Sequence, residues 1–379
     1  MKRNLLLTPG PTQIPPRICE VLGRPIIHHR TPQFQAILKE ATEGLKHVFQ
    51  TKNDIFILTS SGTGAMEAAV CNLLSAGDTA LVAEAGKFGE RWSELCKAYG
   101  IKVEVIKAES GKAVDPAQIE KVLGANKNIK AVFTTLTETS TGVDTDIQAI
   151  GEIVKKTSAV FVVDAISGLG AVDLQTDNWS VDVVVSGSQK GLMLPPGLAF
   201  ISASAKALAL VEKSTSPKYY FSLKKAKKAA DQTDTPFTPA IGIVIALNES
   251  LKMIKEEGLD KLFARYKKLK QGVSAAVKAL GLTLFADPGC ASNVVTAINV
   301  PAGIDGKKLV KTMRDTHGMT FAGGQSELEG KIFRVCHMGA IDEYDILAGI
   351  SCVEKVLKEM GHKFELGAGV MAAQKVFNS

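Results

Sequence analysis

Short apolar runs rich in β-branched residues alternate with helix-patterned stretches along the first part of the chain. Each run is followed by small, polar or charged residues, a pattern that predicts strands buried inside a sheet. The predicted strands cover residues 54–59, 79–83, 102–106, 129–135, 159–163, 181–185 and 198–202. Helical patterns between them, at 33–49, 65–74, 90–99, 116–123 and 147–156, predict an α/β fold with a seven-stranded, mostly parallel sheet between helices.

The pattern changes toward the C-terminus. A long charged stretch predicts one helix over 248–280, and strand, helix, strand and helix follow, ending with a helix over 341–360. We therefore predict an extended N-terminal arm over 1–17, a large domain over 18–257 and a smaller C-terminal α+β domain over 258–379. The X-Pro steps of the arm rule out a helix there. Two interpretations of the arm stay open: it is a simple tether, or its backbone lines a pocket.

A lysine follows one of the predicted buried strands. The strand over 181–185 leads through the small and polar residues 186–189 into Lys190. In open α/β sheets the ligand crevice lies at the carboxyl ends of the strands, so we expect Lys190 to project into a cleft. Burial there lowers the pKa of an amine and makes it a nucleophile toward carbonyl groups. Taken alone, the residue leaves an ordinary solvated lysine open as the alternative.

Two further features fall at the same predicted sheet edge. Asp164 ends the strand over 159–163, and a buried carboxylate needs a cation or hydrogen-bond donors. The strand over 54–59 leads through a small-residue turn over 60–64 into a helix, whose N-terminal N–H groups and dipole favour phosphate. This turn lacks the dinucleotide-binding spacing G-x-G-x-x-G, because Glu67 stands at the third glycine position.

One cofactor, pyridoxal 5'-phosphate (PLP), accounts for all three features. The amine of Lys190 would bond to its aldehyde carbon. Asp164 would pair with its protonated pyridine nitrogen, and the turn over 61–64 would bind its phosphate. Each feature alone is a weak signal, but the three together at one sheet edge predict this cofactor.

Motifs related to this arrangement run almost from end to end. The most specific are S-G-S-Q-K at 186–190 and E-T-S-T-G at 138–142. Others lie at 9–11, 61–67, 86–91, 163–167, 235–239 and 333–335. With these motifs the chain resembles class V aminotransferases of PLP fold type I, in the branch of alanine–glyoxylate and serine–pyruvate aminotransferases. The resemblance implies a PLP-dependent transaminase with a large and a small domain.

The resemblance also assigns contacts around the cofactor. The implied contacts are Ser61, Gly62, Thr63 and Gln189 at the phosphate, Phe88 and Ile166 on the two ring faces, Thr139 beside the ring oxygen, Asp164 at the pyridine nitrogen and Lys190 at the aldehyde carbon. Thr238 is similar to a residue that reaches the phosphate bound in the neighbouring subunit, which implies a homodimer. The family often has a tyrosine where Thr235 stands, so one phosphate contact departs from the pattern.

The implied substrate clamp is Arg334, which resembles the arginine that binds the substrate α-carboxylate. A planar guanidinium suits that task because it donates two parallel hydrogen bonds. Once displaced by the amino acid, Lys190 would shuttle a proton as general base and acid in a ping-pong reaction. The overall resemblance favours alanine or serine as donor and glyoxylate or pyruvate as acceptor.

Several alternatives stay open. Arg30, preceded by His29, resembles the arginine that meets the substrate phosphate in phosphoserine aminotransferases, so phosphoserine or aspartate is an alternative donor. A cysteine-desulfurase-type lyase is less favoured, because Phe88 stands where that family has a histidine and Cys336 lies in a strand-like run. Related chains have also been labelled hydrogenase subunits, but the sequence contains no C-x-x-C pair for a metal cluster.

Composition and charge narrow the partners and the compartment. The chain has 379 residues and a net charge of +6, and its densest basic run, 224–228, is interpreted as a solvated helix face and not as a nucleic-acid site. His28 and His29 lack accompanying ligands, so no metal site is expected. Six cysteines without disulfide spacing, an N-terminus without a signal-peptide core and the lack of a long apolar run predict a cytoplasmic protein that makes no membrane contact.

Overall fold

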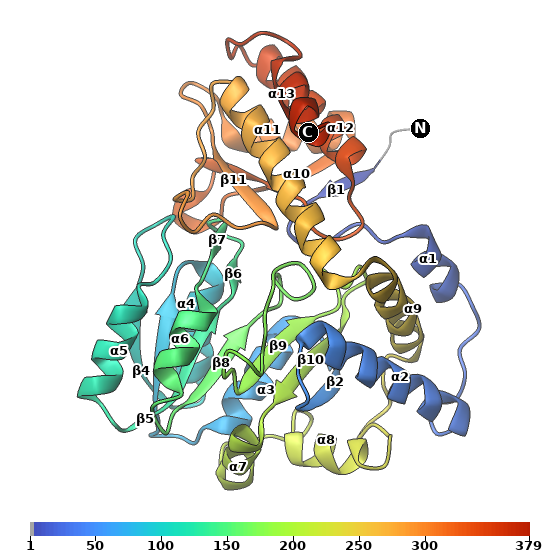
Figure 1. Cartoon of the computed structure of the whole chain (residues 1–379), viewed down its shortest axis with the longest axis vertical. Helices are drawn as coiled ribbons and strands as arrows, with labels where there is room; N and C mark the ends of the chain where they lie inside the picture. The colour runs from blue at the N-terminus through green and yellow to red at the C-terminus, as the bar shows by residue number, and fades with distance from the viewer. Residues whose placement is uncertain (1–3) are drawn as a thin grey trace.

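The predicted strands form one sheet in the computed structural model, which describes residues 4–379 (Figure 1). The strands are β2 (Asp54–Ser60), β3 (Thr79–Glu84), β4 (Lys102–Lys107), β5 (Ile129–Thr135), β8 (Val160–Asp164), β9 (Val183–Gly187) and β10 (Gly197–Ala203). Their order is β2-β10-β9-β8-β5-β3-β4, and β10 runs antiparallel to both neighbours while the remaining pairs are parallel. The predicted seven-stranded, mostly parallel α/β sheet is confirmed.

Helices cover both faces of this sheet. They are α2 (Pro32–Phe49), α3 (Gly62–Leu73), α4 (Lys87–Ala98), α5 (Pro116–Ala125), α6 (Ile147–Val154), α7 (Ala205–Lys213), α8 (Leu223–Ala230) and α9 (Ile241–Glu257). Because side chains alternate along a strand, Val160 and Val162 of β8 pack into the core under α3, α4, α7 and α8, whereas Phe161 and Val163 pack into the core under α2, α5, α6 and α9. The central strands are therefore apolar on both faces.

A second sheet lies above the first in Figure 1, in the order β1-β12-β13-β11. Its strands are β1 (Leu5–Leu7), β11 (Val295–Asn299), β12 (Met319–Gly323) and β13 (Ile332–Cys336), and the helices around it are α10 (Leu259–Ala279), α11 (Gly306–His317), α12 (Glu343–Glu359) and α13 (Ala368–Phe377). The N-terminal β1 pairs in parallel with β12, so the start of the chain completes the C-terminal sheet.

The predicted division into residues 1–17, 18–257 and 258–379 stays a prediction. Residues 1–3 of the predicted arm lie outside the described residues. The arm contains β1 and leads into a short helix, α1 (Pro16–Leu22).

The single long helix predicted over 248–280 is wrong. The chain forms α9 and α10 instead, and Gly258 separates them with a φ of 85° and a ψ of 140°. A glycine adopts this backbone conformation without the steric cost that a side chain would add. The charged helical pattern continues across the break, which is why periodicity alone did not reveal it.

Two other boundaries differ from the prediction. The turn predicted over 60–64 is shorter, because α3 begins at Gly62 and Ser61 is its N-cap residue. The C-terminal helix α13 was not predicted. The buried carboxylate of Glu354 accepts hydrogen bonds from the N–H groups of Gly367, Gly369 and Val370, so a contact from α12 caps the first turn of α13.

The basic run over 224–228 lies on α8, with Leu223 and Ala226 buried and most of its lysines exposed, as the predicted solvated helix face requires. Among the described residues, none of the helices combines the length and the apolar character that crossing a membrane requires.

Candidate active site

Lys190 lies in the loop after β9, against the N-terminal arm. It is 8% exposed, and its Nζ donates a hydrogen bond to the carbonyl oxygen of Pro9. Thr12 holds the arm to this loop, because its N–H donates to Gln189 O at 3.1 Å and its hydroxyl donates to Lys190 O at 2.9 Å. Gly10 has a φ of 124°, and a Cβ there would collide with the lysine side chain. The backbone of the arm therefore lines the Lys190 side chain.

The surroundings of Lys190 favour the neutral amine. Its pKa is lowered to about 8, mainly because burial disfavours the charged form. The positive charges of Arg334 and Arg91 act in the same direction, whereas Cys336 and Asp164 oppose them. With this pKa, roughly a tenth of Lys190 is unprotonated at pH 7, and the neutral amine is the form that acts as a nucleophile or general base.

Asp164 ends β8 beside β9, at the same edge of the sheet as the Lys190 loop. It is 3% exposed, and its Oδ1 accepts a hydrogen bond from the N–H of Ile166 at 2.8 Å. Burial raises the pKa of Asp164 to about 7, and the charge of Glu138 adds to this shift. No other hydrogen bond reaches this carboxylate within residues 4–379. The buried acid can therefore accept a hydrogen bond from a cationic ligand group.

The N-terminus of α3 packs tightly against the end of β9, and a glycine stands on each side of this contact. A Cβ on Gly62 would lie 2.6 Å from Cδ1 of Ile166, and a Cβ on Gly187 would lie 3.3 Å from the N of Gly62. Ser61 makes no side-chain capping bond to the helix. The buried Oε1 of Gln189 has no hydrogen-bond partner in the described part of the chain. The free backbone N–H groups at this helix N-terminus favour anion binding, and the side-chain amide of Gln189 lies beside them.

A buried carboxylate organises the next part of the site. Glu138, in the short strand β6 (Thr137–Glu138), accepts hydrogen bonds from the N–H groups of Phe88 at 2.9 Å and Gly89 at 3.0 Å. It also accepts from the N–H of Ser140 at 3.1 Å and from its hydroxyl at 2.6 Å. Burial raises the pKa of Glu138, and these donors act against that shift. Glu138 thereby ties the first turn of α4, which carries Phe88, to the 138–142 motif.

Arg334 projects from β13 toward the same motif. Its Nε and Nη2 donate to Gly323 O at 3.0 and 2.7 Å, and its Nη1 donates to Thr139 O at 2.7 Å. Burial lowers the pKa of Arg334 to about 10. These bonds use three of the five N–H groups of the guanidinium, so one on each terminal nitrogen is left for a ligand as far as the described residues show.

The structure of one chain does not bring Arg30 or Thr238 to these residues. Arg30 forms an ion pair with Asp234 and a longer hydrogen bond, 3.4 Å, to Thr235 O. Thr238 is exposed. Across residues 4–379, no hydrogen bond or ion pair joins either side chain to Lys190. Instead, Arg30 contacts the surface segment 234–238, which contains Thr238.

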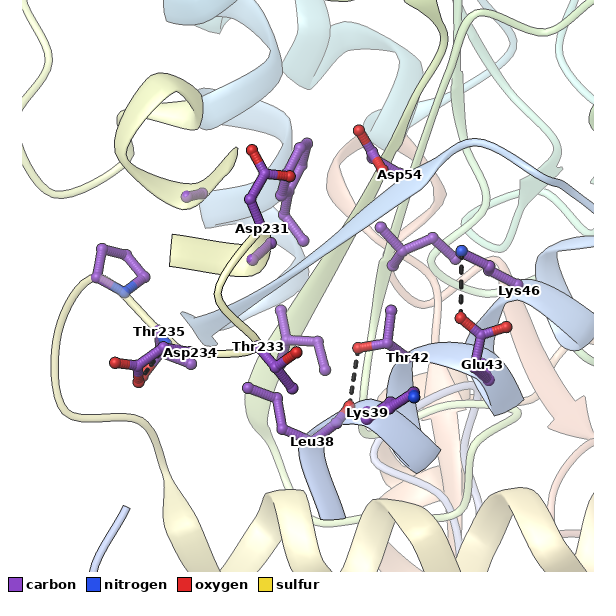
Figure 2. Close-up of a pocket in the computed structure, with 16 residues that line it drawn as sticks. Leu38, Lys39, Thr42, Glu43, Lys46, Asp54, Asp231, Thr233, Asp234 and Thr235 are labelled. Atoms are coloured by element: carbon purple, nitrogen blue, oxygen red, sulfur yellow. Dashed lines mark hydrogen bonds and ion pairs between the residues drawn. The ribbon is translucent and has the colours of Figure 1, made fainter. Parts of the chain in front are cut away.

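A cavity of about 240 Å³ lies elsewhere, between α2, β2 and the end of α8 (Figure 2). Figure 2 shows Lys39, Lys46 and Glu43 on the α2 side and Asp231 and Asp234 across from them. Its lining contains none of the site residues predicted from the sequence. This cavity is therefore separate from the Lys190 site.

Two charged residues of the site belong to motifs found in the sequence, but no role was predicted for either of them. Glu138 is the first residue of E-T-S-T-G and follows the end of the buried strand over 129–135 by three residues, a weaker form of the signal that singled out Asp164. Arg91 follows Phe88 by three residues on α4, a spacing that places two side chains on one helix face.

Within residues 4–379, no group of three or more His, Cys, Asp or Glu side chains is arranged to hold a metal ion.

The chain is similar to known proteins over almost its whole length. Residues 6–330 match the family profile described as Aminotransferase class-V. The chain is 45% identical to a soluble hydrogenase small subunit of Synechococcus sp. (strain PCC 6716), over 100% of this chain and 99% of the relative. It is 39% identical to a serine–glyoxylate aminotransferase of Hyphomicrobium methylovorum, over 98% and 94%.

Two further proteins are similar over almost the whole chain. The chain is 38% identical to an L-aspartate–glyoxylate aminotransferase of Paracoccus denitrificans, over 98% of this chain and 96% of the relative. The solved structure of a ureidoglycine–glyoxylate aminotransferase from Bacillus subtilis superposes with a TM-score of 0.96 at 30% identity, covering 100% and 99% of the two chains.

Proposed function

The chain belongs to the class-V aminotransferase family, and on that premise we propose that it transfers the amino group of a small amino acid to a small 2-oxo acid. Its fold is that of PLP fold type I aminotransferases. The favoured donors are alanine and serine, and the favoured acceptors are glyoxylate and pyruvate. The observation that carries the proposal is the buried Lys190, whose lowered pKa suits an amine that bonds to a carbonyl and moves a proton.

The residues around Lys190 fit pyridoxal 5'-phosphate. Asp164 would hold the pyridine nitrogen, because a carboxylate buried with one backbone donor has capacity for a cationic partner. The phosphate would bind at the N-terminus of α3 with Ser61, Gly62 and Thr63, and Gln189 would contribute through its side-chain amide nitrogen, because phosphate oxygens accept hydrogen bonds. When bound, this cofactor supplies an electron sink for negative charge at the substrate α-carbon.

Three side chains would position the ring of the cofactor. Phe88 would stack on one face and Ile166, which contacts the Gly62 position, would press on the other. Thr139 would lie beside the ring oxygen; its backbone carbonyl oxygen accepts a hydrogen bond from Arg334 Nη1. These roles extend the family resemblance, and the contacts of the described residues are compatible with them.

The protein's own groups then handle the substrate. Arg334 would bind the α-carboxylate with the two N–H groups that its backbone contacts leave over. Lys190 Nζ would take the proton from the α-carbon and deliver it again as a general acid. Burial of both residues excludes water, which strengthens these interactions.

We also propose a homodimer in which Thr238 contacts the phosphate site of the neighbouring subunit. An exposed aromatic group next to that residue supports it, since Tyr219 is 72% exposed and Tyr220 stacks on Phe237 at 5.1 Å between ring centroids. Exposed aromatic clusters are typical of interfaces. Mixing inactive Lys190→Ala subunits with Thr238→Ala subunits tests it, because each mixed dimer then contains one intact site. The activity of the mixture should exceed that of the two variants measured apart, and strictly additive activity would contradict the shared site.

The proposed function is tested on the purified protein by its visible absorption and by a panel of donors and acceptors. We expect bound PLP and transamination of alanine or serine with glyoxylate. Activity restricted to aspartate or phosphoserine would select the alternative suggested by Arg30 and by the aspartate–glyoxylate relative. Release of sulfide from cysteine would select the lyase alternative, although Cys336 is buried in β13. Hydrogenase activity without PLP binding would contradict the proposal and follow the hydrogenase-named relative.

A further inference from the structure

Arg91 lies between two groups that the proposed function places around the cofactor. Its Nη1 donates a hydrogen bond to Thr63 Oγ1 at 3.1 Å, at the N-terminus of α3. Its guanidinium carbon lies 4.9 Å from the ring centroid of Phe88, one turn earlier on α4. Neither the family resemblance nor the comparisons assign a role to Arg91. The same cation therefore joins the proposed phosphate turn to the proposed stacking ring.

The hydrogen bond to Thr63 constrains the direction of its hydroxyl hydrogen. A guanidinium only donates hydrogen bonds, so Thr63 Oγ1 accepts from Arg91. The hydroxyl hydrogen must then point to a different acceptor. At the first turn of α3 that acceptor can be a phosphate oxygen, and the nearby cation strengthens the donor.

The cation–π contact constrains Phe88 in a similar way. Arg91 covers one face of the ring, so a cofactor ring would have to stack on the other face. The N–H of Phe88 is held by Glu138 at 2.9 Å, which fixes the backbone from the other end. Phe88 is thus held at its backbone by a buried carboxylate and at its ring by Arg91.

Charge adds a third contribution that a merely structural link would not make. Arg91 is among the cations that favour the ionised carboxylate of Asp164 and the neutral amine of Lys190. Both effects act in the direction that the proposed chemistry requires, because Asp164 must hold a cation and Lys190 must be free to accept a proton.

We propose that Arg91 is a positioning residue for the cofactor: through Thr63 it orients a hydroxyl toward the phosphate, and through Phe88 it fixes the stacking ring. This inference rests on the proposed PLP-dependent function. Its effect on Lys190 is electrostatic and acts without direct contact.

The test compares Arg91→Met, Arg91→Lys and the control Lys87→Met. Lys87 lies on the same helix turn and pairs with Glu90, so the control removes a nearby cation but leaves Thr63 and Phe88 untouched. From the holoenzyme we would measure the PLP dissociation constant, the pH midpoint of the cofactor's visible absorption and the thermal midpoint of the apoprotein.

We expect Arg91→Met to weaken PLP binding by about 10- to 100-fold, the range for losing one hydrogen bond to a charged group. The pH midpoint should rise, because removing a cation makes proton release from the Lys190 nitrogen harder. Arg91→Lys should be intermediate, since a compact ammonium cannot reach Thr63 and cover Phe88 together. Lys87→Met should match the wild type.

A double-mutant cycle with Thr63→Val keeps the inference testable if Arg91→Met folds poorly. Thr63→Val alone should also weaken PLP binding, and adding Arg91→Met should then cost less than it does in the wild type. Unchanged PLP binding and an unchanged pH midpoint in Arg91→Met, or strictly additive effects with Thr63→Val, would overturn the inference while leaving the proposed function intact. A wild-type protein that binds no PLP would overturn both.

Discussion

Two regions of the molecule hold charged side chains against the large sheet, and they do so in opposite ways. At the carboxyl ends of β8 and β9, Lys190 and Asp164 are buried with few protein partners, and both have shifted pKa values. Around the cavity at the β2 edge, charged groups stay more exposed and pair with one another, as Lys46 does with Glu43 at 3.3 Å (Figure 2). Buried groups with perturbed pKa values are candidates for function, whereas exposed ion pairs contribute ~0–1 kcal/mol to stability.

This difference shows that an open cavity and a reactive site need not coincide. The cavity in Figure 2 has volume and charges, but its charged groups form exposed ion pairs, among them Lys46 with Glu43, Asp231 with Lys227 and Asp234 with Arg30. At the Lys190 site, Lys190 and Asp164 each have one backbone hydrogen-bond partner, which leaves both groups with capacity for a ligand. The predictions below test this contrast, from the largest expected effect to the smallest.

Lys190→Ala should reduce transamination below detection while the protein stays folded. The substitution removes the amine that bonds to the cofactor and also the proton shuttle, and general acid–base catalysis alone contributes ~10²–10⁴-fold. Steady-state assays with circular dichroism check this. The matched control is Lys46→Ala at the β2-edge cavity, which should keep wild-type turnover. Near-normal turnover in Lys190→Ala would remove the central proposal.

Asp164→Asn should lower the transamination rate by roughly 10²–10⁴-fold, far more than it weakens cofactor binding. A neutral amide cannot hold the pyridine nitrogen protonated, so the ring becomes a poorer electron sink. Measuring both kcat and the PLP dissociation constant shows whether the rate falls more than cofactor binding does. If both change little, Asp164 is a structural group and the proposed ring orientation is wrong.

The same substitution should stabilise the cofactor-free protein by an amount that depends on pH. Because the folded-state pKa of Asp164 is raised to about 7, the folded protein binds more protons than the unfolded chain between pH 4 and 7, so stability falls as pH rises through that window. At pH 8 Asp164→Asn should gain up to ~4 kcal/mol in free energy of unfolding, and the gain should vanish near pH 4. Denaturation of the wild-type and Asp164→Asn apoproteins at both pH values checks this. An equal difference in their free energy of unfolding at the two pH values would contradict the argument that burial raises the pKa of Asp164.

Arg334→Lys should lower kcat/KM for every donor, by an amount that corresponds to ~2–4 kcal/mol of lost transition-state stabilisation. The reason is that an ammonium group cannot form the two parallel hydrogen bonds of a planar guanidinium. The loss should be similar for alanine, serine and any acidic donor, because all share the α-carboxylate. A donor panel at one pH measures it. A loss confined to a single donor would place Arg334 at the substrate side chain instead.

Arg30→Ala should change kcat/KM for alanine and serine by less than ~1 kcal/mol, because the residue is exposed and paired with Asp234. Acidic donors test the alternative that the substrate is phosphoserine or aspartate. A loss of ~2–4 kcal/mol with phosphoserine or aspartate would show that Arg30 meets a second anionic group. Asp234→Ala is the matched control, since it breaks the same ion pair and leaves the guanidinium in place.

The sequence by itself determined the large sheet and the residues at its carboxyl edge. Strand signals are local, since β-branched runs such as 129–135 and 159–163 form strands wherever both faces are covered by helices. The alternation of strands with helices then predicted a largely parallel sheet, and Lys190 and Asp164 followed from their places at strand ends. Their roles stay predictions that rest on this edge and on the family motifs.

Only the tertiary structure shows which contacts connect these local elements. The arm meets Lys190 through Pro9 O, and Glu138 reaches across to the first turn of α4, contacts between residues far apart in sequence. The capping of α13 by Glu354 and the ion pair between Arg30 and Asp234 are of the same kind. No periodicity encodes such pairs, because burial and hydrogen bonding between distant segments arise only when the chain packs into its three-dimensional fold.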